Sequence, residues 1–174
     1  MLSFVREEEY NGHYEFYRAE MLRLSVFERS YPELKGKDTV LLARLGQRKE
    51  PARRMAELRG SVLLHEIYFR SFGERDFLRS DAVRREFGSE SKLLSEIYTR
   101  ALELPYGFAG IALCRGRLSV FAEKSLSAPY NVGEPLLALD VCEHAYYGTY
   151  GFDKSGYLDA ALRRLRLDIL DKLA

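Results

Sequence analysis

The sequence predicts an α+β protein in which an N-terminal helical hairpin lobe precedes an α/β lobe with a small three-stranded antiparallel sheet. Through about residue 102, apolar residues recur mostly at the three- and four-residue spacing of helices. Beyond residue 106 the pattern changes to short apolar runs bounded by turn residues, which is typical of strands. We therefore expect an N-terminal helical domain over residues 1–75 and a C-terminal α+β domain over residues 76–174.

The first half contains the predicted helical hairpin. A long helix is expected over residues 2–28, and Asn11-Gly12 predicts an interruption, either a kink or a close approach of another backbone, because glycine is unfavourable inside helices. Asp38 is a suitable N-cap for a short helix. Another helix is expected to open after Pro51, since proline suits the first turn. These helices give the hairpin its two long arms and the connection between them.

The second half begins with two connecting helices and then changes to strands. Ser80 or Asp81 can cap the first of these helices, and a second is expected over residues 90–102. Three apolar runs then predict the strands of the sheet, at residues 107–114, 118–122 and 135–141. A single amphipathic helix is expected from Asp153 to Leu170.

Composition excludes several classes of function. The 27 basic residues nearly balance the 26 acidic ones, so no basic excess favours nucleic acid or an anionic membrane as a partner. Cys114 and Cys142 lie in apolar runs and form no disulfide or metal-binding spacing. The N-terminus lacks the pattern of a secretory signal, and no apolar run is long enough to span a membrane. We therefore expect a cytoplasmic protein with reduced cysteines.

A carboxylate and a histidine follow the last predicted strand. Asp140 ends an apolar run and is therefore expected to be buried, where a charge needs an ion pair, a proton or a cation. His144, four residues later, is a natural co-ligand for a cation. The alternative is that Asp140 caps the following helix.

Two helices offer further candidate ligands. His65 lies among apolar residues and is expected to be buried, either as a core histidine with satisfied nitrogens or as a ligand. Glu9, His13 and Tyr17 follow one another at four-residue spacing, so they share one face of the first helix, although such a stripe is also common on solvated surfaces. Imidazoles combined with carboxylates suit iron, manganese or zinc.

Several segments, in order along the chain, resemble motifs of the iron/manganese superoxide dismutases. Residues 140–146, Asp-Val-Cys-Glu-His-Ala-Tyr, resemble the family's Asp-x-Trp-Glu-His-Ala-Tyr signature. Residues 65–69 resemble its ligand helix, and residues 10–17 resemble a first-helix segment that ends in a His-x-x-x-Tyr pair. Residues 87–89 resemble its Phe-Gly-Ser turn, and residues 107–110 stand where a Gly-Trp-rich strand begins.

The resemblance implies a metal site between the two domains. It makes His65, Asp140 and His144 three of the family's four ligands. The family has a histidine one turn before its His-x-x-x-Tyr pair, and here that place is held by Glu9, which we expect to be the fourth ligand. In the alternative, the helix shifts by one turn and His13 becomes the ligand.

The implied activity is superoxide dismutation by one redox-cycling iron or manganese ion per subunit. His13 and Tyr17 match the family's outer pair, which gates access to the metal and relays protons. Glu143 and Tyr147 match residues that contact the partner subunit, so the resemblance implies a homodimer.

The chain departs from the family at residues around the metal. The family's glutamine beside the bound solvent is replaced by Ser61 at one of its two possible places and by about Leu126 at the other. Phe69 and Cys142 stand where the family has tryptophans. Because such residues tune the redox potential, the alternative is a metal-binding relative without efficient dismutase activity.

Overall fold

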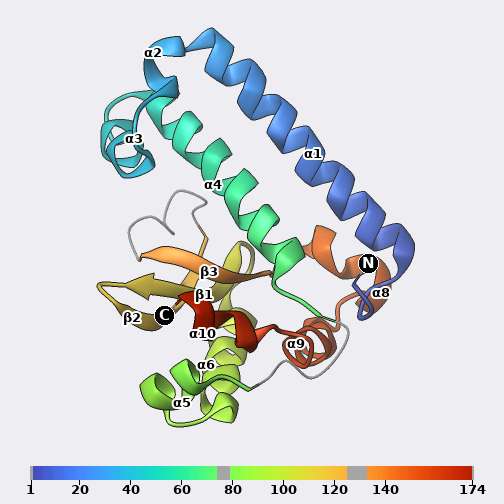
Figure 1. Cartoon of the computed structure of the whole chain (residues 1–174). Coiled ribbons are helices and arrows are strands. Elements are labelled where there is room, and N and C mark those ends of the chain that lie inside the picture. Colours follow the sequence, from blue (N-terminus) through green and yellow to red (C-terminus); the bar gives the residue numbers. More distant parts are fainter. Residues whose placement is uncertain (1, 74–78, 125–132, 174) are drawn as a thin grey trace.

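The structure, a computed structural model, describes residues 2–73, 79–124 and 133–173. Its N-terminal region is a hairpin of two long antiparallel helices, α1 (Glu7–Ser30) and α4 (Glu50–Arg70), as Figure 1 shows. The short helices α2 (Pro32–Lys35) and α3 (Thr39–Gly46) connect them at the tip. The expected helical hairpin is confirmed.

Local sequence signals explain much of the hairpin. The Asp38 carboxylate accepts hydrogen bonds from the amides of Val40 and Leu41, so the expected N-cap of α3 is present. The tip has a small core of its own, formed by Leu34, Leu42, Ala52, Met55 and Ala56. Helix α1 continues through Asn11-Gly12 without interruption, and no other backbone in the described ranges approaches closely there, because a Cβ at residue 12 would meet no atom within 4 Å.

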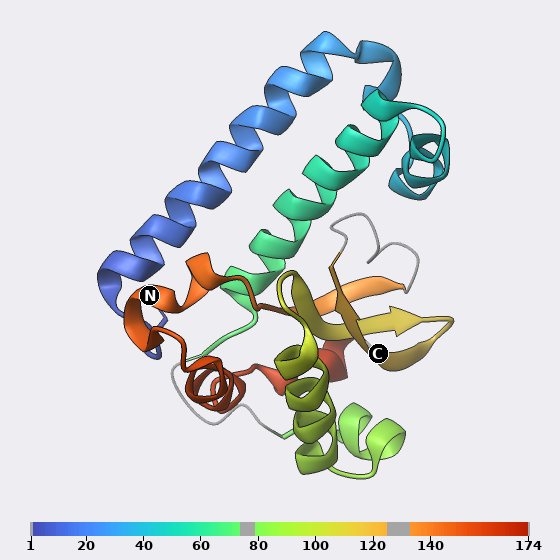
Figure 2. The same ribbon diagram turned by 180° about the vertical axis from the view of Figure 1, so that it is seen from behind.

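The C-terminal region contains the predicted sheet. Its strands β1 (Phe108–Cys114), β2 (Arg117–Glu123) and β3 (Glu134–Asp140) are antiparallel in the order β2-β1-β3. Before the sheet come α5 (Asp81–Phe87) and α6 (Glu90–Glu103), which are capped by the side chains of Ser80 and Ser89. Helix α6 packs against β1 and β2, while α4 packs along β3 (Figure 2).

The chain after the sheet differs from the single helix that we expected there. The structure has η1 (Glu143–Ala145), α8 (Tyr147–Tyr150), α9 (Lys154–Leu162), η2 (Leu167–Ile169) and α10 (Leu170–Leu173). The expected helix breaks after α9 because the chain there pairs with the segment after α4. Leu165 forms an antiparallel bridge with Phe72, and the Arg166 amide donates to the Ser71 carbonyl. These contacts take backbone groups that a continuous helix would need.

The main hydrophobic core joins the two regions. Leu64, Ile67 and Tyr68 of α4 belong to the same buried cluster as Ile111 and Leu137 of the sheet. The boundary between domains at residue 75 remains a prediction. No helix in the described ranges is both long and apolar enough to cross a bilayer.

Candidate metal centre

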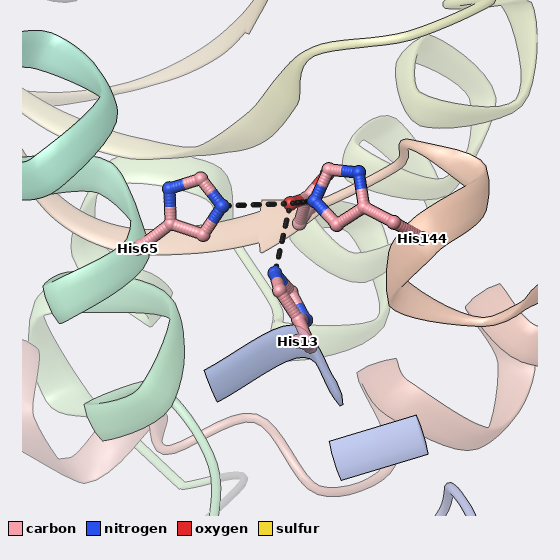
Figure 3. Close-up of side chains that lie close together, drawn as sticks. His13, His65 and His144 are labelled. Atoms are coloured by element: carbon pink, nitrogen blue, oxygen red, sulfur yellow. Dashed lines mark ion pairs between the residues drawn. The ribbon is translucent and has the colours of Figure 1, made fainter. Parts of the chain in front are cut away.

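Four elements bring three histidines and an aspartate together. His13 comes from α1, His65 from α4, Asp140 from the end of β3 and His144 from η1. Their ligand-type atoms all lie within 4.8 Å of one another. In Figure 3 the three imidazoles point at a single carboxylate oxygen. Residues that are up to 131 positions apart in sequence therefore form one compact group.

Asp140 is at the centre of this group and has no exposed surface. Its Oδ1 accepts a hydrogen bond of 2.8 Å from the Cys142 amide, and the Tyr157 hydroxyl donates to its backbone carbonyl at 2.7 Å. The register of the sheet, which pairs Phe108 with Asp140, sets the end of β3 at this point. The second carboxylate oxygen, Oδ2, is left facing the histidines.

The three imidazoles approach this oxygen through the same ring atom. Nε2 lies 3.2 Å from Asp140 Oδ2 in His13, 3.5 Å in His65 and 3.0 Å in His144. The other nitrogen of His65, Nδ1, is 2.7 Å from the Ser61 carbonyl, to which it can only donate. In a neutral His65, Nε2 is therefore the unprotonated nitrogen, with its lone pair directed at the centre.

These atoms meet the requirements of a metal site. Within the described chain, Nε2 of His13, Nε2 of His65 and Oδ2 of Asp140 are buried without a hydrogen-bond partner, and buried polar atoms are rarely left so. Ligand atoms bound about 2.1 Å from a metal lie about 3–4 Å from one another, which agrees with the separations of 3.0–3.5 Å from Asp140 Oδ2. Imidazoles with a carboxylate suit iron and manganese.

The electrostatics favour an anionic centre. Burial by itself raises the pKa of Asp140, but the close approach of the His13 and His144 imidazoles to its carboxylate outweighs burial and holds that pKa well below its usual range. Burial lowers the pKa of His65 more than Asp140 raises it. In the more exposed His144, burial also lowers the pKa, but the carboxylate of Asp140 dominates and the pKa rises. Asp140 is therefore ionised at neutral pH, ready to bind a cation.

Glu9 lies outside this group, which differs from its expected place. Its carboxylate instead accepts hydrogen bonds from the backbone amides of Gly148 and Thr149. The buried histidine that points at Asp140 is His13, one turn further along α1. The arrangement matches the alternative in which the helix shifts by one turn. The Thr149 amide also donates to the Tyr146 carbonyl at 3.0 Å, and the Glu9 carboxylate adds a charged acceptor at the start of α8.

An aromatic ring that the sequence had not singled out covers the imidazoles. The ring of Phe16 lies 4.6 Å from that of His144 and 5.4 Å from that of His65, measured between centroids. Phe16 is 38% exposed, so the ring lies between solvent and one side of these histidines, while His144 keeps exposed surface elsewhere. Its position three residues after His13, on the same face of α1, was the signal that could have identified it.

Tyr17 and Phe69 are two further rings beside the imidazoles. The Tyr17 ring is stacked on His65 with centroids 6.2 Å apart, and the Phe69 ring contacts His13 at 5.1 Å. Burial, followed by the nearby charge of Glu66, raises the pKa of Tyr17. The Tyr17 hydroxyl therefore keeps its proton at neutral pH.

The positions expected to tune the site contain small or apolar groups. Ser61 is buried beside His65, with its hydroxyl 3.5 Å from Nδ1. Leu126 lies outside the described residues. Burial raises the pKa of the Cys142 thiol, which accepts a hydrogen bond from the Gly107 amide. Among the described residues that we expected around the metal, none is a glutamine or tryptophan.

The two residues expected at a subunit interface lie on the surface of the chain. Glu143 is exposed, and Tyr147 is 46% exposed. The Tyr147 ring contacts that of Phe152, whose side chain is 88% exposed. An exposed aromatic pair therefore lies close in sequence to His144.

Comparison with known proteins agrees with the geometry of the site. Residues 78–172 match the family model "Iron/manganese superoxide dismutases, C-terminal domain". The chain is 31% identical over 112 residues to "Superoxide dismutase [Fe]" of Cupriavidus metallidurans, covering 60% of this chain and 57% of that protein. It is 29% identical over 122 residues to the protein of the same name from Bacteroides fragilis, covering 65% and 63%.

A third relative extends the comparison to a protein named for both metals. The chain is 33% identical over 108 residues to "Superoxide dismutase [Mn/Fe]" of Porphyromonas gingivalis, covering 57% of this chain and 56% of that protein. In all three comparisons the chain spans less than two thirds of the relative's length. The family match covers more than half of the chain and includes Asp140 and His144. The chain therefore belongs to the iron/manganese superoxide dismutase family.

Proposed function

We propose that this protein binds one iron or manganese ion per chain and disproportionates superoxide to dioxygen and hydrogen peroxide. The observation that carries the proposal is the convergence of three imidazole nitrogens on one buried oxygen of Asp140. The names of the relatives, which specify iron or both metals, support the same pair of metals. The described residues contain a single group of this kind, in keeping with one ion per chain.

The proposed ligands are His13, His65, Asp140 and His144. In this proposal His13 takes the place that the sequence favoured for Glu9, because its Nε2 faces Asp140 while the Glu9 carboxylate is engaged by backbone amides. Asp140 supplies the anionic ligand, and the bond from His65 to the Ser61 carbonyl holds one imidazole in the required tautomer.

When bound, iron or manganese supplies the one-electron chemistry that oxidises one superoxide and reduces the next. The residues around it would control access and protons. The Phe16 ring excludes water from one side of the ligand group, since it covers His65 and His144. Tyr17 is the proposed proton donor because its hydroxyl remains protonated beside the ligand His65. His13, which we expected to share this role, is assigned to the metal instead.

We also propose a cytoplasmic homodimer. Glu143 and Tyr147, which match partner-contacting residues of the family, are exposed, and Phe152 extends the exposed aromatic surface. Burial of such aromatic groups is typical of subunit interfaces. Sedimentation of the purified protein measures this assembly, and a monomer at micromolar concentration would count against it.

The experiment that tests the function combines metal analysis with a superoxide assay. The purified chain is reconstituted separately with iron and with manganese, and bound metal and superoxide consumption are measured. We expect about one ion per chain and a rate above that of the free ion. His13→Ala should lose the metal, as should His65→Ala, while the exposed Glu8→Ala should retain it. Full metal occupancy with superoxide consumption no faster than that of the free ion would instead support the alternative, a metal-binding relative without efficient dismutase activity.

A further inference from the structure

Glu9 attaches the start of α1 to the segment that carries His144. Its Oε1 accepts from the Gly148 amide and its Oε2 from the Thr149 amide, both at 2.6 Å. The Arg6 amide adds a hydrogen bond of 2.9 Å to the Thr149 hydroxyl. Hydrogen bonds to a charged carboxylate are stronger than neutral ones, and two in parallel also fix its orientation. This contact, named here the Glu9 clamp, joins residues about 140 positions apart.

Both ends of the Glu9 clamp lie four residues from a proposed ligand, within α1 at one end and between η1 and α8 at the other. His13 follows Glu9 by four residues in α1, and His144 precedes Gly148 by four residues. His144 is the most exposed of the four, with 36% of its side chain accessible, against 2% for His13 and 2% for His65. The surrounding core therefore restrains His144 least, and a local contact has the most influence on its position.

Gly148 allows the carboxylate to come this close. A Cβ atom at residue 148 would lie 3.1 Å from Glu9 Oε1 and 3.3 Å from Glu9 Cδ. Those separations are tighter than ordinary van der Waals contact, so a larger residue would push the carboxylate away from the amides. The contact therefore depends on both Gly148 and Glu9.

We propose that Glu9 is a positioning residue, which holds His144 at the correct distance from His13 and thereby sets the metal affinity. The inference rests on the proposed metal site and assigns Glu9 a role that is not that of a ligand. Residues that orient metal ligands typically change affinity by about 10–100-fold when they are removed. The predicted effect of the clamp is near the lower end of that range, because it acts on one ligand of four.

The test measures iron and manganese affinity by competition with a chelator, for the full chain and four variants. Glu9→Ala should weaken binding about tenfold, and Glu9→Gln should weaken it less, because its amide oxygen can still accept one hydrogen bond. Gly148→Ala should act in the same direction as Glu9→Ala. The adjacent Glu8→Ala, which removes an exposed charge of the same sign, is the matched control and should bind as the unaltered chain does.

A double-mutant cycle separates positioning from a general structural role. In a His144→Ala background, titrated with excess metal so that the weaker binding by the three remaining ligands is measured, the effect of Glu9→Ala on affinity should nearly vanish, because Glu9 acts through that histidine. An undiminished effect in that background would overturn the proposal, as would equal affinities of Glu9→Ala and Glu8→Ala. If Glu9→Ala fails to fold, Gly148→Ala and Glu9→Gln carry the same prediction.

Three outcomes separate this inference from the proposed function and from the earlier expectation. If the unaltered chain holds no metal, the proposed function fails and the positioning role fails with it. If it holds metal and the metal affinity does not change when Glu9 is substituted, only the positioning role fails. If Glu9→Gln abolishes binding as fully as His65→Ala does, Glu9 is a ligand and the positioning role is again overturned.

Discussion

The two sides of the ligand group differ in how the chain holds them. On the side of the sheet, Asp140 is completely buried, with Oδ1 bound to the Cys142 amide and its carbonyl to Tyr157. On the side of α1, Phe16 and Tyr17 contact the imidazoles only through their rings and retain exposed surface. Hydrogen bonds fix Asp140 on the first side, whereas Phe16 and Tyr17 meet the imidazoles on the second side by ring packing.

This difference predicts that metal affinity and the rate of turnover depend on opposite sides of the ligand group. The atoms that would hold the metal have well-defined partners and match the family signature at residues 140 and 143–146. The groups that would meet superoxide or deliver protons lie mainly on α1, and with His13 as ligand Tyr17 and Met21 occupy the next two positions one turn apart on that face. We therefore expect variants on the sheet side to change affinity and variants on the α1 side to change mainly the rate.

The largest expected effect is that of Asp140→Asn. The asparagine keeps the size of the side chain but removes the one anionic group among the four proposed ligands and places an amide donor among imidazole nitrogens. Iron or manganese affinity should fall by at least about 100-fold, beyond the effect of residues that merely orient ligands. Equilibrium competition with a chelator measures it, and retention of near-normal affinity would show that the histidines alone suffice.

Tyr17→Phe should have the next largest effect, confined to the rate. The ring stacked on His65 is kept, while the hydroxyl that would donate a proton is removed. We expect the metal content to be unchanged and superoxide consumption to fall about 100-fold, the lower end for loss of a proton-transfer group. Stopped-flow decay of superoxide measures the rate. Tyr14→Phe, on the same helix but more exposed, is the control, and equal losses in both would contradict a specific role for Tyr17.

Phe16→Ala should expose the proposed ligands to solvent from the α1 side, and it therefore tests what the ring packing on that side contributes. Loss of the ring that covers His65 and His144 should accelerate metal release to a chelator by roughly tenfold, since the apolar shell controls solvent access. Phe16→Leu should retain most of the cover. The exposed Leu22→Ala, six residues further along α1, is the control for loss of apolar surface alone. Equal release rates in all three variants would mean that Phe16 does not shield the site.

Gly12→Ala has the smallest expected effect and should leave the site unchanged. A Cβ at this exposed position in α1 meets no atom within 4 Å. Alanine is about 1 kcal/mol more favourable than glycine inside a helix, which corresponds to a rise of about 2–4 °C in Tm for a chain of this size. Thermal unfolding of the metal-free protein measures the gain. A lower Tm would show that glycine at residue 12 stabilises the protein through something other than its helix propensity.

Short-range chemistry predicted much of this molecule from the sequence. Asp38 and Ser80 cap the helices at which they were expected, because a side-chain oxygen bonds amides only two or three residues away. The three strands were predicted from apolar runs and turns, and the burial of Asp140 followed from its place at the end of one run. All of these features depend on neighbours in the chain.

Contacts between distant segments decided the rest. The C-terminal helix is broken because residues near Leu165 pair with the chain after α4, about 90 positions away. The register of α1 is a subtler case: Glu9 and His13 lie one turn apart on the same face, so helical spacing alone cannot say which faces the site. The sequence by itself determined that a carboxylate and histidines would meet near residue 140. Only the tertiary structure decided that His13 joins them while Glu9 binds the amides of α8, because that choice depends on distances between segments.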